Sequence, residues 1–275
     1  MPSRGSARDY AVMSEPPRNA GDRLPPFETA ITRARQARYH ACCEVGGALY
    51  GDRADFSILG NDCLRAYNAA GLEIDGAVHL TQRFVRHANI GIDAPLVACG
   101  RIATAEQTPK GRQLLYVFEV HGPDGAVAVT SEMGILEADA AALSARPPSR
   151  ARATRPAEAT EGLAPLARKQ LTPERVMGYS QEVGNRIHFE PEFAQAIGYR
   201  APIAQGQMSI TWMVEALEAT GAPERLELSA RFLRPLFWDD SVEIRGSPGA
   251  GVPARLVSLN PAGRIACAGT ARAAP

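Results

Sequence analysis

Two segments of the chain combine helical spacing of apolar residues with a glycine at the end. In FSILGNDCLRAYNAAG the apolar residues form one stripe, and Gly71 suits the C-terminal cap. In QMSITWMVEALEATG a largely apolar surface ends at Gly221. We therefore predict two long helices that each bury one face, one in each half of the chain.

A shorter helical pattern precedes each long helix. The segment RARQARYHACCEV follows Thr32, a good N-cap, and is expected to stop at Gly46-Gly47. In the second half, Thr172 and Pro173 combine an N-cap with proline at the first helical position, and the helix is expected to run up to Gly184. The apolar positions that recur at helical spacing in the first of these segments are Ala34, Ala37, Ala41 and Val45.

Alternating or β-branched runs follow each long helix and indicate strands. The first set is GAVHLTQRFVRH, APLVACGRIAT, RQLLYVFEVHG and AVAVTSEMGILEA, with a turn at Pro123-Asp124-Gly125 between the last two. The second set is RLELSARFLRPLFWDDSVEIRGSP, PARLVSLN and RIACAGTARA, with a turn at residues 260–263. The two halves share this order, helix first and antiparallel strands afterwards, although they do not repeat letter by letter.

The pattern divides the chain into four parts. Residues 1–26 have no apolar run and are expected to form a flexible arm, and residues 27–137 form the first unit of helix and strands. Residues 138–170 are rich in alanine, proline and arginine without a period, which is typical of a linker. Residues 171–275 form the second unit. Because no aromatic residues alternate with the linker arginines, a solvated connector is favoured over a nucleic-acid-binding arm.

Composition and charge narrow the class of protein. In 275 residues, 45% apolar content permits a substantial core, and the 30 Lys and Arg residues balance the 30 Asp and Glu residues. We therefore expect neither nucleic acid nor a membrane as partner. The five cysteines show no metal-ligand spacing, so we expect reduced thiols and no metal. Without a signal-peptide-like run or roughly 20 consecutive apolar residues, the expectation is a soluble, cytoplasmic protein.

Residues 179–209 contain an isolated histidine, a short acidic helix and a glycine-bearing turn directly before the second long helix. The order is Asn-Arg-Ile-His at 185–188, five residues, Ala194, and Pro-Ile-Ala-Gln-Gly at 202–206. This resembles the MaoC-like, or type 2 (R-specific) enoyl-CoA hydratase, family, whose signature is Asp-x-Asn-Pro-Ile/Leu-His, five residues, Ala, and later Pro-Ile-Ala-His-Gly. The departures are Arg186 for proline, Val183 for the catalytic aspartate and Gln205 for histidine.

The resemblance implies an α+β double hotdog, with two antiparallel sheets each wrapped on a long central helix. It implies an acyl dehydratase or enoyl hydratase that acts on 3-hydroxyacyl or trans-2-enoyl thioesters of CoA or acyl carrier protein, without a cofactor. It places the site in the second half and leaves the first half, which lacks the motif, to accommodate the acyl chain. A homodimer is a further expectation.

Within this resemblance, each candidate residue suits one task. His188, on an exposed loop, can act as acid or base near neutrality, and Gly206, at a helix start, can donate its N–H to a thioester oxyanion with Gln205 beside it. Two residues could replace the aspartate. Glu182 could supply a carboxylate, and Asn185, which takes the aspartate position if the loop is shorter, could orient water but not take its proton.

Two other functions stay open. A hotdog acyl-CoA thioesterase carries an acidic residue on its central helix, and Asp62 is the candidate for that residue here. A non-catalytic subunit that binds acyl thioesters is favoured by the loss of the family aspartate. The remaining histidines are expected to be structural: His40, His79, His87 and His121.

Overall fold

The computed structural model describes residues 16–138, 160–248 and 252–274. Most of the predicted arm and linker therefore lies outside the described residues. The first half contains β1 (Phe27–Ala30), α1 (Arg33–Cys43), the 3-10 helices η1 (Gly47–Leu49) and η2 (Phe56–Ile58), α2 (Leu59–Ala69), β2 (Ala77–Arg86), β3 (Pro95–Thr108), β4 (Gly111–His121) and β5 (Val127–Ala138).

The second half repeats this order. It contains β6 (Ala164–Gln170), α4 (Pro173–Ser180), the 3-10 helix η4 (Arg186–His188), α5 (Pro191–Ala196), α6 (Gly206–Ala219), β7 (Leu226–Phe232), β8 (Ser241–Gly246), β9 (Arg255–Leu259) and β10 (Ile265–Ala273). The predicted long helices, strands and turns are confirmed. Gly71 and Gly221 follow the long helices with φ of 76° and 77°, a conformation that glycine adopts without strain.

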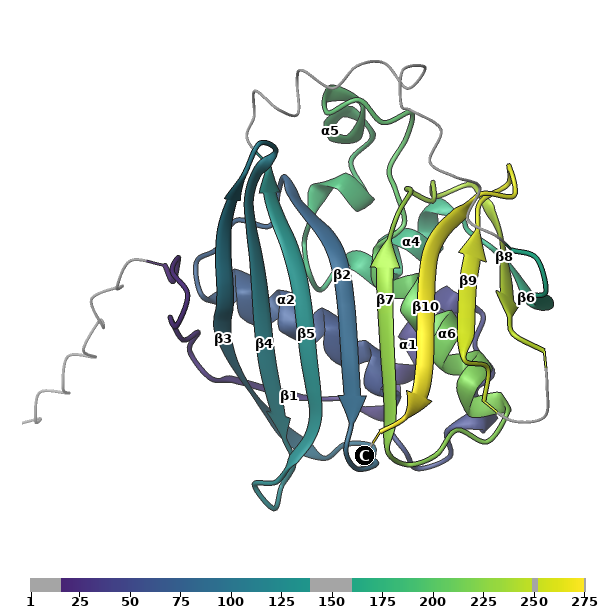
Figure 1. Ribbon diagram of the computed structural model, residues 1–275, viewed down its shortest axis with the longest axis horizontal. Helices are drawn as coiled ribbons and strands as arrows, with labels where there is room; N and C mark the ends of the chain where they lie inside the picture. The colour runs from purple at the N-terminus through teal and green to yellow at the C-terminus, as the bar shows by residue number, and fades with distance from the viewer. Residues whose placement is uncertain (1–15, 139–159, 249–251, 275) are drawn as a thin grey trace, which may run out of the picture.

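The strands of the described residues form one continuous antiparallel sheet in the order β1-β3-β4-β5-β2-β7-β10-β9-β8-β6. The two predicted antiparallel sheets are joined into one, because β2 pairs with β7 from Thr81↔Arg231 to Arg86↔Leu226. The strand order on one side of this junction mirrors the order on the other. Figure 1 shows the helices α1, α2 and α6 on one face of the sheet.

Strand β6 corrects the predicted linker of residues 138–170. It pairs with β8 at the edge of the sheet, as β1 pairs with β3 at the other edge. Its sequence, APLARKQ, lacks apolar alternation because little of the strand is buried; Leu166 is 41% exposed. The predicted flexible arm of residues 1–26 is also corrected at its end, since Leu24 is buried and donates its N–H to the Gly100 carbonyl on β3.

Helix α1 begins after the Thr32 cap as predicted, but it buries the other face. Its alanines are exposed, and the helix ends at Cys43, with Glu44 in a left-handed conformation before the two glycines. The polar side chains are buried because each finds a partner, as His40 does at 3.0 Å from Asp55. The buried residues are Arg35, Gln36, Tyr39, His40 and Cys43.

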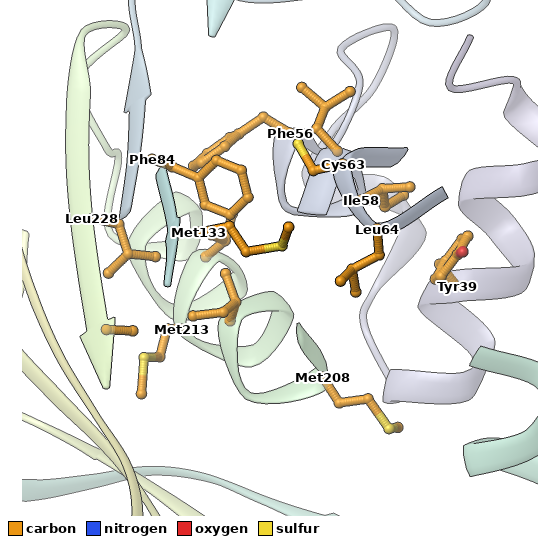
Figure 2. Packing of buried hydrophobic residues seen from close by; sticks show 14 of the residues in the cluster. Tyr39, Phe56, Ile58, Cys63, Leu64, Phe84, Met133, Met208, Met213 and Leu228 are labelled. Atoms are coloured by element: carbon orange, nitrogen blue, oxygen red, sulfur yellow. The ribbon is translucent and has the colours of Figure 1, made fainter. Parts of the chain in front are cut away.

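The two central helices contact the sheet, α2 at β3 and β5 and α6 at β9 and β10, and α1 contacts α6. Figure 2 shows Phe84 and Leu228, from strands on the two sides of the junction, directed toward the helices that carry Phe56 and Met213. Phe56 and Phe84 meet edge to face with ring centroids 5.7 Å apart. None of the helices in the three described ranges is long and apolar enough to cross a membrane. The five cysteines are free thiols.

Candidate functional site

A cavity of about 250 Å³ lies where the two halves meet. Elements from both halves line it: β2 from the first, and η4, the start of α6 and the end of β7 from the second. Four of the five predicted site residues, Asn185, His188, Gln205 and Gly206, are among the lining residues, and Glu182 is not. A wider hollow of about 430 Å³ is lined by strand residues alone and contains none of the five.

His188 is the last residue of η4 and is buried rather than exposed as predicted, with 7% of its surface accessible. Its Nδ1 lies 2.8 Å from the Ile203 carbonyl oxygen. Because a carbonyl only accepts, Nδ1 carries the hydrogen and Nε2 keeps a lone pair. Burial lowers the pKa of His188 to about 4, although the Ile203 carbonyl and the charge of Asp75 act in the opposite direction. The imidazole is therefore neutral at pH 7.

Asn185 caps the turn that carries His188. Its Oδ1 accepts from the Ile187 N–H at 3.2 Å, and its Nδ2 donates to the Ile74 carbonyl at 3.3 Å. The next residue, Arg186, donates its N–H to Asp75 Oδ1 at 3.1 Å. The η4 turn is thus held by the loop of the first half that precedes β2, and both ends of the Asn185 amide are already in use.

Glu182 lies in an ion cluster between α1 and the loop that follows α4. Its carboxylate accepts from Arg35, from Arg38 and, at 3.0 Å, from the Tyr39 hydroxyl, and Arg35 also pairs with buried Asp62 at 2.8 Å. Burial alone would raise the pKa of Glu182, but the guanidinium contacts outweigh it and lower this pKa to about 2. The carboxylate is committed to connecting the halves, so the structure does not bring it together with His188.

Gly206 is the first residue of α6, so its N–H has no partner within the helix. A Cβ on this residue would lie 2.8 Å from the Phe232 ring, so any larger residue would require that ring to shift. Gln205, the N-cap, donates from Nε2 to Asn61 Oδ1 at 2.5 Å. Its Oε1 is buried and, among the described residues, has no hydrogen-bond partner.

The cavity also contains residues that sequence reasoning missed. His79, which was expected to be structural, lies on β2 and lines the cavity. Tyr199 and Arg234 line it from the second half. The described lining residues include no Asp or Glu; Val183 and Asn185, the two residues that could align with the aspartate of the resembled family, both line the cavity. No motif marks His79, because its place in the cavity depends on the pairing of β2 with β7.

The first half has the same local geometry without the same chemistry. Gly46 caps η1 with φ of −70° and ψ of 115°, close to the −73° and 115° of Asn185. The last residue of η1 is Leu49, whereas the last residue of η4 is His188. The first central helix begins, through η2, with Phe56 rather than with a glycine. An apolar side chain therefore stands at each position that would correspond to the histidine and the glycine.

No family model and no curated protein sequence matches the chain. Among solved structures, it is similar to HtdX of Mycobacterium tuberculosis, with a TM-score of 0.74 and 19% identity over 92% of this chain and 100% of that one. A MaoC-like dehydratase from Phytophthora capsici gives a TM-score of 0.64 and 13% identity over 91% and 96% of the two chains. A conserved Mycobacterium tuberculosis protein described as a double hotdog gives 0.59 and 12% over 93% and 96%. The likeness shows an α+β hotdog-type fold.

Proposed function

We propose that the protein is a hydro-lyase that adds water to, or removes it from, the acyl chain of a thioester of CoA or acyl carrier protein. One observation carries the proposal: the neutral imidazole of His188 and Gly206, whose N–H has no partner within α6, line the same cavity. The first can move a proton, and the second can stabilise an oxyanion. The likeness in fold to a MaoC-like dehydratase supports the same chemistry.

In the hydration direction, Nε2 of His188 takes a proton from water as the oxygen of that water bonds to C3 of a 2-enoyl thioester. The electron pair of the C2–C3 double bond moves toward the thioester, and the charge on its oxygen is stabilised by the Gly206 N–H and the positive end of the helix dipole. The imidazolium then returns the proton to C2. One water is consumed, the imidazole is regenerated, and dehydration is the reverse sequence.

The two halves have different tasks in this proposal. The second half supplies both chemical groups, whereas the first half has Leu49 and Phe56 at the corresponding places. The first half contributes apolar lining residues on three of its segments, Leu64, Ile74 and Ile135. We assign these residues to the acyl chain, because an apolar surface favours the methylene groups and leaves the thioester beside Gly206.

The test is turnover by the purified protein of trans-2-enoyl and 3-hydroxyacyl thioesters of several chain lengths, each on CoA and on acyl carrier protein. Interconversion of enoyl and hydroxyacyl forms is expected. His188→Ala should lower the rate by about 10²–10⁴-fold, the usual contribution of a general acid or base. Circular dichroism of the variant serves as the folding control. A variant that keeps the wild-type rate would show that His188 is not the proton carrier.

Two alternatives give different results in the same assay. Release of free thiol would indicate a thioesterase, but Asp62, the candidate for that chemistry, is fully buried and held by Arg35 and Arg65. Binding of an acyl thioester without any turnover would indicate a non-catalytic subunit. The cavity favours that second alternative in one respect, since none of the described lining residues is a carboxylate.

A further inference from the structure

The cavity contains a second imidazole that the proposed chemistry has not used. His79 lies on β2 in the first half, and its ring packs against the Phe232 ring with centroids 4.7 Å apart. The Phe232 ring in turn closes over Gly206, within about 2.8 to 3.1 Å of the position a Cβ would take there. His79 is therefore separated from the proposed oxyanion site by a single aromatic ring.

A β-bulge directs His79 into the cavity. His79 pairs with Ile135 and Thr81 pairs with Gly134, so Leu80 is an extra residue in the ladder. Further along β2, Gln82 is buried. Strict alternation from Gln82 would place residue 79 on the opposite face of the sheet, and the extra residue reverses that assignment. A bulge that re-aims one side chain is a feature often found beside active sites.

The hydrogen bonds of His79 fix which nitrogen can accept. Its Nε2 lies 3.0 Å from the Thr81 carbonyl oxygen, which can only accept, so Nε2 carries the hydrogen and Nδ1 keeps a lone pair. Gln82 also interacts with the ring, but its amide is engaged with Ser131 at 2.8 Å and with Gln207 at 2.9 Å. Burial lowers the pKa of His79 to about 4, so this imidazole is neutral at pH 7 as well.

Building on the proposed hydro-lyase function, we propose that His79 holds the reacting water together with His188. A water molecule has two hydrogens, and the cavity offers two neutral imidazoles that each have one nitrogen lone pair. His188 Nε2 takes the hydrogen that is transferred, and His79 Nδ1 accepts a hydrogen bond from the one that stays on oxygen. No charge has to be created on His79 at any step. The first half thereby supplies what the aspartate of the resembled signature would have supplied.

The experiment compares two reactions of the full-length protein in D₂O. Hydration of an enoyl thioester needs the held water, whereas exchange of the C2 hydrogens of the saturated acyl thioester needs only His188 and the oxyanion site. His79→Phe keeps a ring against Phe232 and should lower hydration by roughly 10²-fold, as expected for a misplaced reactant, while exchange stays within about threefold of wild type. His188→Ala should lose both reactions.

The matched control is His87→Phe, because His87 is another part-buried histidine of the first half, bonded to Thr130 at 2.9 Å and outside the cavity. It should leave both reactions unchanged. If His79→Phe hydrates within threefold of the wild-type rate, the role of His79 is overturned while the proposed function stands. The same conclusion follows if His79→Phe loses hydration and exchange in parallel. A wild-type protein inert in both reactions would overturn the proposed function and this inference with it.

Discussion

The Glu182 cluster gives a prediction that separates stabilisation from catalysis. The pKa of this carboxyl is about 2 in the folded protein against an ordinary 4.5, which corresponds to about 3 kcal/mol of folding free energy at neutral pH. Its side chain is 17% exposed, so screening reduces this value to about 2 kcal/mol. In Glu182→Gln, Arg35 still pairs with Asp62 at 2.8 Å, so no buried charge is left uncompensated.

Urea unfolding at several pH values measures this contribution. Glu182→Gln should lower the free energy of unfolding by about 2 kcal/mol at pH 7. Because the folded pKa is depressed, the wild-type advantage is present above about pH 4.5 and is lost as the pH falls toward 2. The control is Glu190→Gln, which removes an exposed pair with Arg186 and should cost less than about 1 kcal/mol.

Turnover is measured on the same variant. Per folded molecule, Glu182→Gln should keep the wild-type rate, because the carboxylate does not line the cavity. A stability within about 0.5 kcal/mol of wild type, or a difference that does not change with pH, would refute the electrostatic reasoning. A tenfold loss of turnover with unchanged stability would mean that Glu182 takes part in catalysis rather than in stabilising the fold.

Two other predictions follow from the cavity and the sheet. The kcat/KM for hydration should not change with pH around neutrality and should fall only as the pH approaches about 4, where His188 and His79 gain protons. A midpoint of the pH profile near 6.5, the ordinary pKa of histidine, would mean that the imidazoles are not buried in solution. Residues 16–138 and 160–275 expressed separately should be insoluble or should require each other, because separation exposes the edges of β2 and β7; two soluble monomers with sharp melting transitions would contradict the continuous sheet.

Short sequence patterns predicted those helices and turns whose formation depends on residues nearby in the sequence. The long helices, their glycine stops and the turns at Gly125 and Gly263 needed only the sequence within a few positions. The face of α1 could not be predicted in this way, because Arg35 is buried by Glu182, which lies 147 residues further along the chain. Strand β6 was missed because edge pairing, not apolar burial, holds it.

The same distinction applies to the candidate site. His188, Gln205 and Gly206 belong to one motif, and the structure places them in one cavity. His79 and Asp75 belong to the other half and reach the site only through the junction and the loop before β2. The contacts of Glu182 could not be predicted from its position near the motif, because its neighbour Val183 lines the cavity whereas the Glu182 carboxylate bonds to Arg35 on α1.

The pairing of β2 with β7 joins two halves of different sequence, which affects how substitutions act on the cavity. In a symmetric pair of identical chains, every substitution occurs twice, so a residue that improves one copy of the site alters the other copy equally. The two halves of this chain differ in sequence, so that constraint does not apply to them. Leu49 stands at the place that corresponds to His188, and His79 lines the cavity from the first half. One continuous sheet therefore allows the two halves to contribute different side chains to a single cavity.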